Sequence, residues 1–78
     1  MRTQTVYIET TIVSYLAGRP SHDLLTAACQ QATRDWWEGY RSQYELYTSQ
    51  LVIVEAGAGD SETAKKRLGL LEGIPQLG

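Results

Sequence analysis

The chain has 78 residues, enough for one small domain with a modest hydrophobic core. Its hydrophobic content of 42% argues against disorder, and its net charge of −2 argues against a strongly basic surface for nucleic acid. Cys29 is the single cysteine, which excludes an intrachain disulfide and suits a reducing cytoplasm. We find no apolar run that would cross a bilayer and no signal segment at the start, so the expected location is the cytoplasm.

The first predicted unit is a short strand that ends in an acid. Residues 6–8 (Val-Tyr-Ile) are β-branched or aromatic and fit a buried strand. Glu9 follows at the carboxyl end of this strand, where open α/β sheets bind ligands. Glutamate is a poor helix cap, and Thr10 or Thr11 can cap the helix that follows, which leaves Glu9 without an evident structural role. This stretch alone is consistent with a site carboxylate and with an ordinary solvated acid.

Two helices are predicted before the next strand. The first covers residues 10–17, with its apolar residues on one face, and ends at Gly18, which we expect to be left-handed. The second contains about twenty residues, and Ser21 is its expected cap. Its expected apolar stripe consists of Leu24, Leu25, Ala28, Ala32 and Trp36, widened by Trp37 and Tyr40. Its expected polar face consists of Gln30, Gln31, Arg34, Asp35 and Glu38.

Three residue types on this helix invite a functional reading that we consider secondary. Trp36 and Trp37 resemble base-stacking residues, but aromatic residues at helical spacing favour core packing. Cys29 is expected to pack against a neighbouring helix rather than to act as a nucleophile, because the chain has only one histidine and nothing ties it to the thiol. That histidine, His22, is expected at the surface rather than in a metal or catalytic site.

Residues 44–49 alternate apolar and polar positions, the pattern of a second strand. A strand that follows the first across a long helix favours a βαβ crossover and parallel pairing. Ser49 is the expected cap of a third helix over residues 50–58, although its β-branched start also fits a buried strand. Glu55 interrupts this apolar run, and its plainest interpretation is a solvent-facing helix residue.

A fourth helix is predicted over residues 62–71, with Asp60 or Ser61 as its cap. The glycines before it indicate a tight turn rather than a phosphate loop. The basic residues 65–67 are more typical of a solvated face than of a site for RNA or an acidic partner. Gly73 and Pro75 end the helix, and residues 76–78 are a possible start of a third strand. The predicted order is therefore β-α-α-β-α-α, in the α/β class.

Several of these stretches together resemble the amino-terminal half of PIN-domain proteins, and above all the VapC-like toxins of type II toxin–antitoxin modules. The matching stretches are residues 6–11, 15–16, 19–21, 36–37, 45–49, 52–56, 59–60 and 64–68. The resemblance implies that residues 1–78 form a partial, truncated PIN-like domain, with a doubly wound parallel sheet flanked by helices. It also implies a Mg²⁺- or Mn²⁺-dependent nuclease, a hydrolase of RNA phosphodiesters.

Carried over by residue, Glu9 matches the first acid of the family, usually an aspartate, and Glu55 matches the second. Both would then be catalytic metal ligands, and Thr11 matches the position that supports the first acid. Carboxylate oxygens are the ligands that hard divalent ions prefer, and such an ion can acidify a water and neutralise phosphate charge.

The chain departs from the family pattern because the third and fourth acids of the family lie in a second half that it does not have. We therefore expect weak metal binding and no activity in isolation. An open sheet edge and uncovered apolar helix faces predict a homo-oligomer. Two functions remain open: a ribonuclease whose acid cluster is completed by another polypeptide or a second copy, and a non-catalytic remnant that serves as an interaction or oligomerisation module, for instance with an antitoxin.

Overall fold

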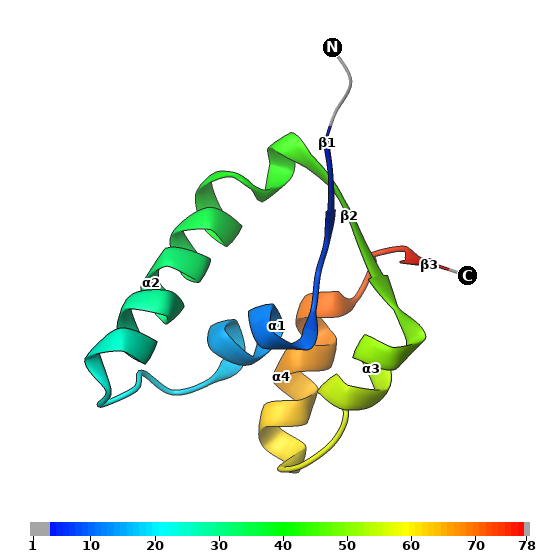
Figure 1. Ribbon diagram of the computed structural model, residues 1–78. Helices are drawn as coiled ribbons and strands as arrows, with labels where there is room; N and C mark the ends of the chain where they lie inside the picture. Colours follow the sequence, from blue (N-terminus) through cyan, green and yellow to red (C-terminus); the bar gives the residue numbers. More distant parts are fainter. Residues whose placement is uncertain (1–3, 78) are drawn as a thin grey trace.

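Parallel strands and α-helices alternate along the chain in the computed structural model, which describes residues 4–77 (Figure 1). The elements are β1 (Gln4–Tyr7), α1 (Thr10–Ala17), α2 (Leu24–Gly39), the 3-10 turn η1 (Arg41–Gln43), β2 (Tyr44–Ser49), α3 (Gln50–Ala56), α4 (Ser61–Leu71) and β3 (Gln76–Leu77). The strand order is β1-β2-β3, and β2 is parallel to both neighbours. This confirms the α/β class, the parallel sheet and the predicted order of elements. None of the described helices is both long enough and apolar enough to cross a bilayer.

The two longer strands present one face to the core and the other to solvent. Val6 of β1 lies opposite Leu46 of β2, and both side chains pack against the buried cluster. Thr5, Tyr7 and Glu45 alternate with them along the strands and are exposed, as the period of two in a strand requires. At these positions the second face of the sheet is uncovered, so the helices on both faces that the resemblance implies are not seen there.

Hydrogen bonds around Thr48, near the carboxyl end of β2, connect this strand to the carboxyl end of β1 and to the start of β3. Its backbone N–H donates to the carbonyl of Pro75, just before β3, at 2.8 Å. Its hydroxyl donates to the carbonyl of Ile8, just after β1, at 3.1 Å. Ile8 in turn donates its N–H to Tyr47 at 2.7 Å. Thr48 is fully buried, and the bond to the Ile8 carbonyl gives its hydroxyl the partner that a buried polar side chain needs.

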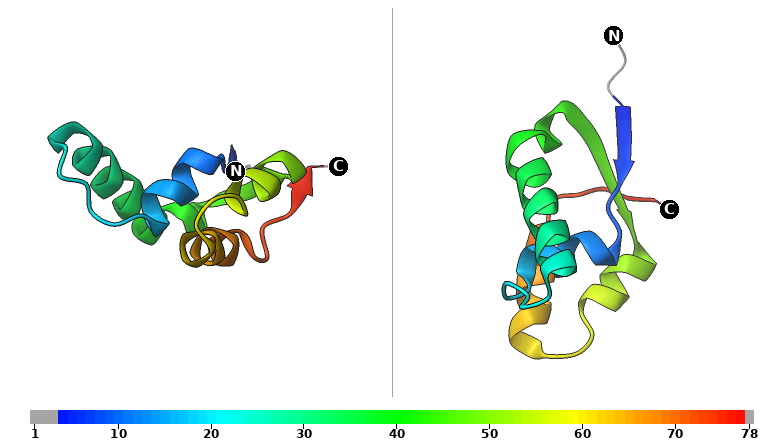
Figure 2. Two further views of the ribbon diagram at one scale, coloured as in Figure 1. Left: turned by 90° about the horizontal axis from the view of Figure 1, so that it is seen from below. Right: turned by 60° about the vertical axis from the view of Figure 1, so that its left-hand side comes forward.

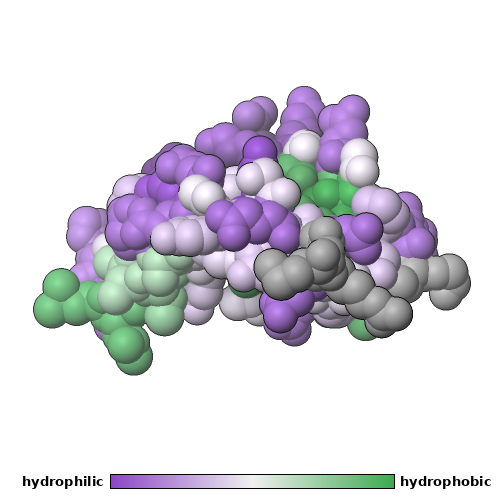
Figure 3. Space-filling view, turned by 90° about the horizontal axis from the view of Figure 1, so that it is seen from above, coloured by the Kyte–Doolittle hydropathy of each residue, from purple (hydrophilic) through white to green (hydrophobic). Residues whose placement is uncertain are grey.

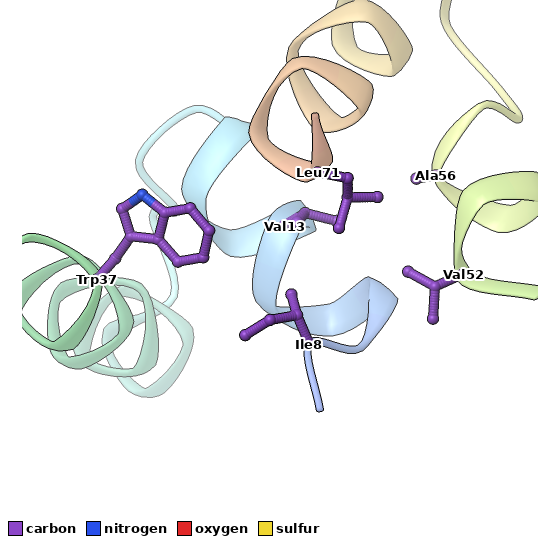
Figure 4. Packing of buried hydrophobic residues seen from close by; sticks show 6 residues of the cluster. All are labelled: Ile8, Val13, Trp37, Val52, Ala56 and Leu71. Carbon is purple, nitrogen blue, oxygen red and sulfur yellow. The ribbon is translucent and has the colours of Figure 1, made fainter. Parts of the chain in front are cut away.

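The core draws side chains from the end of β1 and from four helices (Figure 4). Its buried members are Ile8, Val13, Trp37, Val52, Ala56 and Leu71. Trp36 packs against this cluster, with its ring centroid 6.5 Å from that of Trp37. The prediction that the tryptophans serve packing is confirmed.

The orientation of α2 differs from the prediction. Leu24 is 87% exposed and Leu25 is 76% exposed, and Ala28 and Ala32 are also exposed. The predicted apolar stripe therefore faces solvent over most of its length, and the prediction was wrong. The face turned inward carries Gln30 and Trp37, which are the buried residues of the helix.

Gln30 explains this orientation. Its side-chain carbonyl accepts a hydrogen bond from the Ser21 N–H at 2.9 Å, and its side-chain amide donates to the Arg19 carbonyl at 3.0 Å. Both backbone groups belong to the loop between α1 and α2 and are partly buried, so each requires a partner. Placing Gln30 against this loop turns the leucines of the first helical turn outward.

The ends of α1 and α2 also differ from the prediction. Asp23, not Ser21, caps α2, because its carboxylate accepts from the Thr26 N–H at 2.9 Å, while the Ser21 hydroxyl accepts from the Asp23 N–H at 3.0 Å. Gly18 is extended, with φ −73° and ψ 159°, rather than left-handed. Glycine is still required there, because an added Cβ would lie 2.9 Å from the Ser14 carbonyl oxygen.

The later helices agree more closely with the sequence. The stretch after β2 is helical, and Ser49 caps it by accepting from the Val52 N–H at 3.3 Å. Helix α3 ends at Ala56, two residues before the predicted position 58. Asp60 caps α4 by accepting from the Thr63 N–H at 3.0 Å.

Candidate functional site

Glu9 lies between β1 and α1, at the carboxyl edge of the sheet. Its backbone is extended, with φ −88° and ψ 166°, and it occupies the N-cap position of α1 without a side-chain capping bond. The prediction that Thr10 or Thr11 caps this helix was wrong, because the chain turns directly from strand into helix and Glu9 is the last extended residue. The carboxylate of Glu9 is exposed.

Glu55 comes to the same part of the molecule from α3. Its Oε1 accepts a hydrogen bond of 2.6 Å from the hydroxyl of Thr10, the residue that follows Glu9. Figure 1 shows the reason: α1 begins where β1 ends, and α3 begins where the neighbouring β2 ends. Because the two strands are parallel, these starting points meet at one edge of the sheet. The structure therefore brings Glu55 into contact with Thr10, the residue that follows Glu9.

Thr10 is the residue of this site that the sequence prediction did not single out. Thr11, the predicted support of the first acid, lies exposed in the first turn of α1. Two adjacent threonines differ by about 100° around a helix axis, so only one of them faces α3. The sequence offers the hydroxyl, but the choice between the two depends on how α1 packs against α3.

A second polar pair lies at the same edge. The hydroxyls of Tyr7, on β1, and Ser49, on β2, are 2.7 Å apart. Ser49 also caps α3, the helix that carries Glu55. This contact therefore links the start of α3 to the end of β1.

The donor atoms at this edge suit a hard divalent cation in kind but not in number. Carboxylate and hydroxyl oxygens are the ligands that Mg²⁺ and Mn²⁺ accept, and Mg²⁺ demands an octahedral set. Within residues 4–77, however, no group of three or more histidine, cysteine, aspartate and glutamate side chains is arranged to hold a metal ion. Glu9 and Glu55 would need further ligands from water or from another chain.

The acids with a shifted pKa serve the helices instead. The Thr26 N–H lowers the pKa of Asp23, and the Thr63 N–H lowers the pKa of Asp60; in both cases the threonine hydroxyl adds to the effect. These are the N-caps of α2 and α4. Their shifts therefore report capping and not chemistry.

The basic residues 65–67 do not act as one group. Arg67 donates from Nε to the Ala56 carbonyl at 2.8 Å and from Nη2 to the Ala58 carbonyl at 2.6 Å. It thereby satisfies carbonyls at the end of α3 and holds the turn into α4. Lys65 and Lys66 are exposed, so these two lysines provide the free charge of the cluster.

Both predicted acids are exposed at this edge of the sheet. Three hollows of 390–580 Å³ that the described residues line all border α4, and neither Glu9 nor Glu55 lines any of them.

Comparisons of the chain with protein-family models, with curated proteins and with solved structures find no match.

Proposed function

We propose that this chain carries part of a PIN-type, metal-dependent ribonuclease site, of the kind found in VapC-like toxins, and is inactive until another polypeptide or a second copy completes the acid cluster. The observation that supports this proposal is the hydrogen bond between Thr10 and Glu55. It brings the second predicted acid beside the residue that follows the first, across 45 positions of sequence.

In this proposal Glu9 and Glu55 are the ligands of a Mg²⁺ or Mn²⁺ ion, held weakly because further ligands are missing. A divalent ion bound there would supply a more acidic water and neutralise charge on a phosphodiester. The Thr10 hydroxyl holds one oxygen of Glu55 and thereby orients the carboxylate, and Thr11 supports the first acid.

The proposed substrate is RNA, and the proposed completing partner is a protein of antitoxin type or a further copy of the chain. Lys65 and Lys66 are exposed and would add favourable charge for a polyanion. The single free cysteine, Cys29, is half-buried and fits the reducing cytoplasm that we propose as the compartment.

The test measures Mn²⁺ binding and RNA cleavage in the same samples. Wild type, Glu9→Gln and Glu55→Gln are titrated with Mn²⁺ by electron paramagnetic resonance, and each is incubated with structured RNA. Glu45→Gln is the matched control, because Glu45 is exposed near the amino end of β2, away from the carboxyl edge that carries the site. We expect weak Mn²⁺ binding that both site variants reduce and the control does not.

A non-catalytic remnant that serves as an interaction or oligomerisation module is the second candidate. The observation that favours it is that residues 4–77 hold no cluster of three metal-ligating side chains. Mn²⁺ binding that is equal in wild type, Glu9→Gln and Glu55→Gln would support this candidate and contradict the nuclease proposal, whereas both candidates expect no cleavage by the isolated chain.

A further inference from the structure

Helix α2 begins with two leucines that project from the body of the molecule. Leu24 is 87% exposed and Leu25 is 76% exposed. Figure 3 shows the resulting hydrophobic protrusion at the end of the molecule where α2 starts. Single exposed leucines are common on protein surfaces, whereas these two adjacent side chains protrude together and form one exposed apolar patch.

A hollow of 580 Å³ lies between the end of α1 and α4. Its apolar lining consists of Leu16, Ala17, Pro20 and Leu70. A leucine side chain has roughly the volume of four waters, about 120 Å³ at 30 Å³ each. The hollow is therefore large enough for two leucine side chains.

The charges beside the two features are opposite. Arg19 and Lys66 contribute positive charge to the hollow. Asp23 directly precedes Leu24, and the Thr26 N–H lowers the pKa of its carboxyl group, so it is ionised at neutral pH. The projecting turn is thus apolar with a negative flank, and the hollow is apolar with a positive flank.

We propose that Leu24 and Leu25 of one copy insert into the hollow of a second copy, and that the second copy does the same in return. Within one chain the leucines are exposed, so they do not fill their own hollow. The loop between α1 and α2 (Figure 2) connects the two features. Pro20 of this loop lines the hollow, and Leu24, four residues later, is the first residue of α2. Complementary features that lie side by side on one surface form the self-complementary patch that a twofold dimer requires.

The first test measures the dimer dissociation constant of the full chain by sedimentation equilibrium, from about 1 µM to about 1 mM. We expect the double variant Leu24→Ser/Leu25→Ser to raise this constant by at least about 100-fold, because each dimer buries four leucines. The matched control is Leu51→Ser/Val54→Ser on α3, where the side chains are 65% and 60% exposed. This control is expected to leave dimerisation unchanged.

The second test probes the hollow. Lys66→Glu is expected to raise the dissociation constant by about tenfold, because it faces the ionised Asp23 of the partner copy. Lys65→Glu makes the same charge change one residue away, on a side chain that does not line the hollow, and should have no effect. Gly69→Gln should also weaken the dimer, since Gly69 lines the hollow and an added Cβ there meets nothing within 4 Å.

Circular dichroism of every variant establishes that the fold is retained. The proposal is overturned by a wild type that stays monomeric at about 1 mM, by equal weakening from the two double variants, or by equal effects of the two lysine changes. Open-ended polymerisation overturns it as well, because reciprocal insertion closes at two copies.

Discussion

Gln30 is the residue whose replacement most directly tests why α2 faces as it does. It is 8% exposed, and its side chain bonds two backbone groups of the loop between α1 and α2. Replacing it with alanine leaves the Ser21 N–H and the Arg19 carbonyl without these partners.

The expected loss in the free energy of unfolding is about 2 kcal/mol. Each lost hydrogen bond contributes about 0.5–1.5 kcal/mol, and a buried group left without a partner costs about 1–3 kcal/mol. Both groups are only partly buried, so water can replace part of the loss, and alanine regains a few tenths of a kcal/mol through its higher helix propensity. For a domain of this size, about 2 kcal/mol corresponds to a fall in Tm of roughly 8–16 °C.

The assay is thermal and urea unfolding at one low protein concentration, followed by circular dichroism. Gln31→Ala is the control: Gln31 is exposed, and its side-chain amide donates to Asp35 at 2.8 Å on the helix surface. Such an i,i+4 contact contributes only about 0.2–0.5 kcal/mol. Amide exchange at Ser21 should also accelerate in Gln30→Ala. A loss in Gln30→Ala no larger than that in Gln31→Ala would refute the role assigned to Gln30.

Further predictions concern single positions. Gly69→Ala should raise the free energy of unfolding by roughly 0.5–1 kcal/mol, because glycine is unfavourable inside a helix. Gly73→Ala should lower the free energy of unfolding, because φ is +83° at that position. Urea unfolding that ranks the two variants in the opposite order would contradict these predictions. Asp23 and Asp60 have lowered folded pKa values, so they stabilise the fold above the ordinary carboxyl value of 3.8 and lose this contribution as the pH falls below it. In the double variant Asp23→Asn/Asp60→Asn, the free energy of unfolding should accordingly fall less steeply with decreasing pH than in wild type. The same pH dependence in both proteins would count against capping by the charged carboxylates. Thr48→Val should lower the free energy of unfolding by about 1–2 kcal/mol, because it removes a buried hydroxyl donor. An unchanged midpoint of chemical denaturation would contradict this prediction.

The sheet and the element order were predictable because their signals are local. Residues 44–49 alternate apolar and polar side chains, and the strand observed is Tyr44–Ser49. Ser49 and Asp60 are good caps in the right places, and both cap in the structure. The parallel pairing followed from the long connection between two strands.

The orientation of α2 was not predictable in the same way. Its apolar residues lie on one face at its start, whereas its buried residues are Gln30 and Trp37. The loop between α1 and α2 provides the reason, because it contains backbone groups that only a side chain of α2 can satisfy. A helical pattern read from one segment contains no information about such a distant requirement.

The candidate site was predictable as residue types but not as contacts. Glu9 stood out because an acid ends a β-prone stretch, and Glu55 because it interrupts an apolar one. The hydroxyl that binds Glu55 belongs to Thr10, and neither capping rules nor spacing distinguish it from Thr11.

The proposed metal site and the proposed dimer interface lie in different parts of the molecule, so each can be tested without the other. Helix α2 begins at one end of the molecule and α3 lies toward the other, as both Figure 1 and the first view of Figure 2 show. Neither Glu9 nor Glu55 lines the hollow that would receive the leucines. We therefore expect the proposed dimer to leave the edge with Glu9 and Glu55 open and to add no carboxylate to it. Two carboxylates leave most positions of an octahedral ion to water, which keeps its affinity low in the monomer and in this dimer alike. Mn²⁺ affinity should consequently be the same in wild type and in Leu24→Ser/Leu25→Ser. If the double variant lost Mn²⁺ binding as well as dimerisation, the second copy would be supplying metal ligands. The proposed insertion of Leu24 and Leu25 into the hollow would then be wrong.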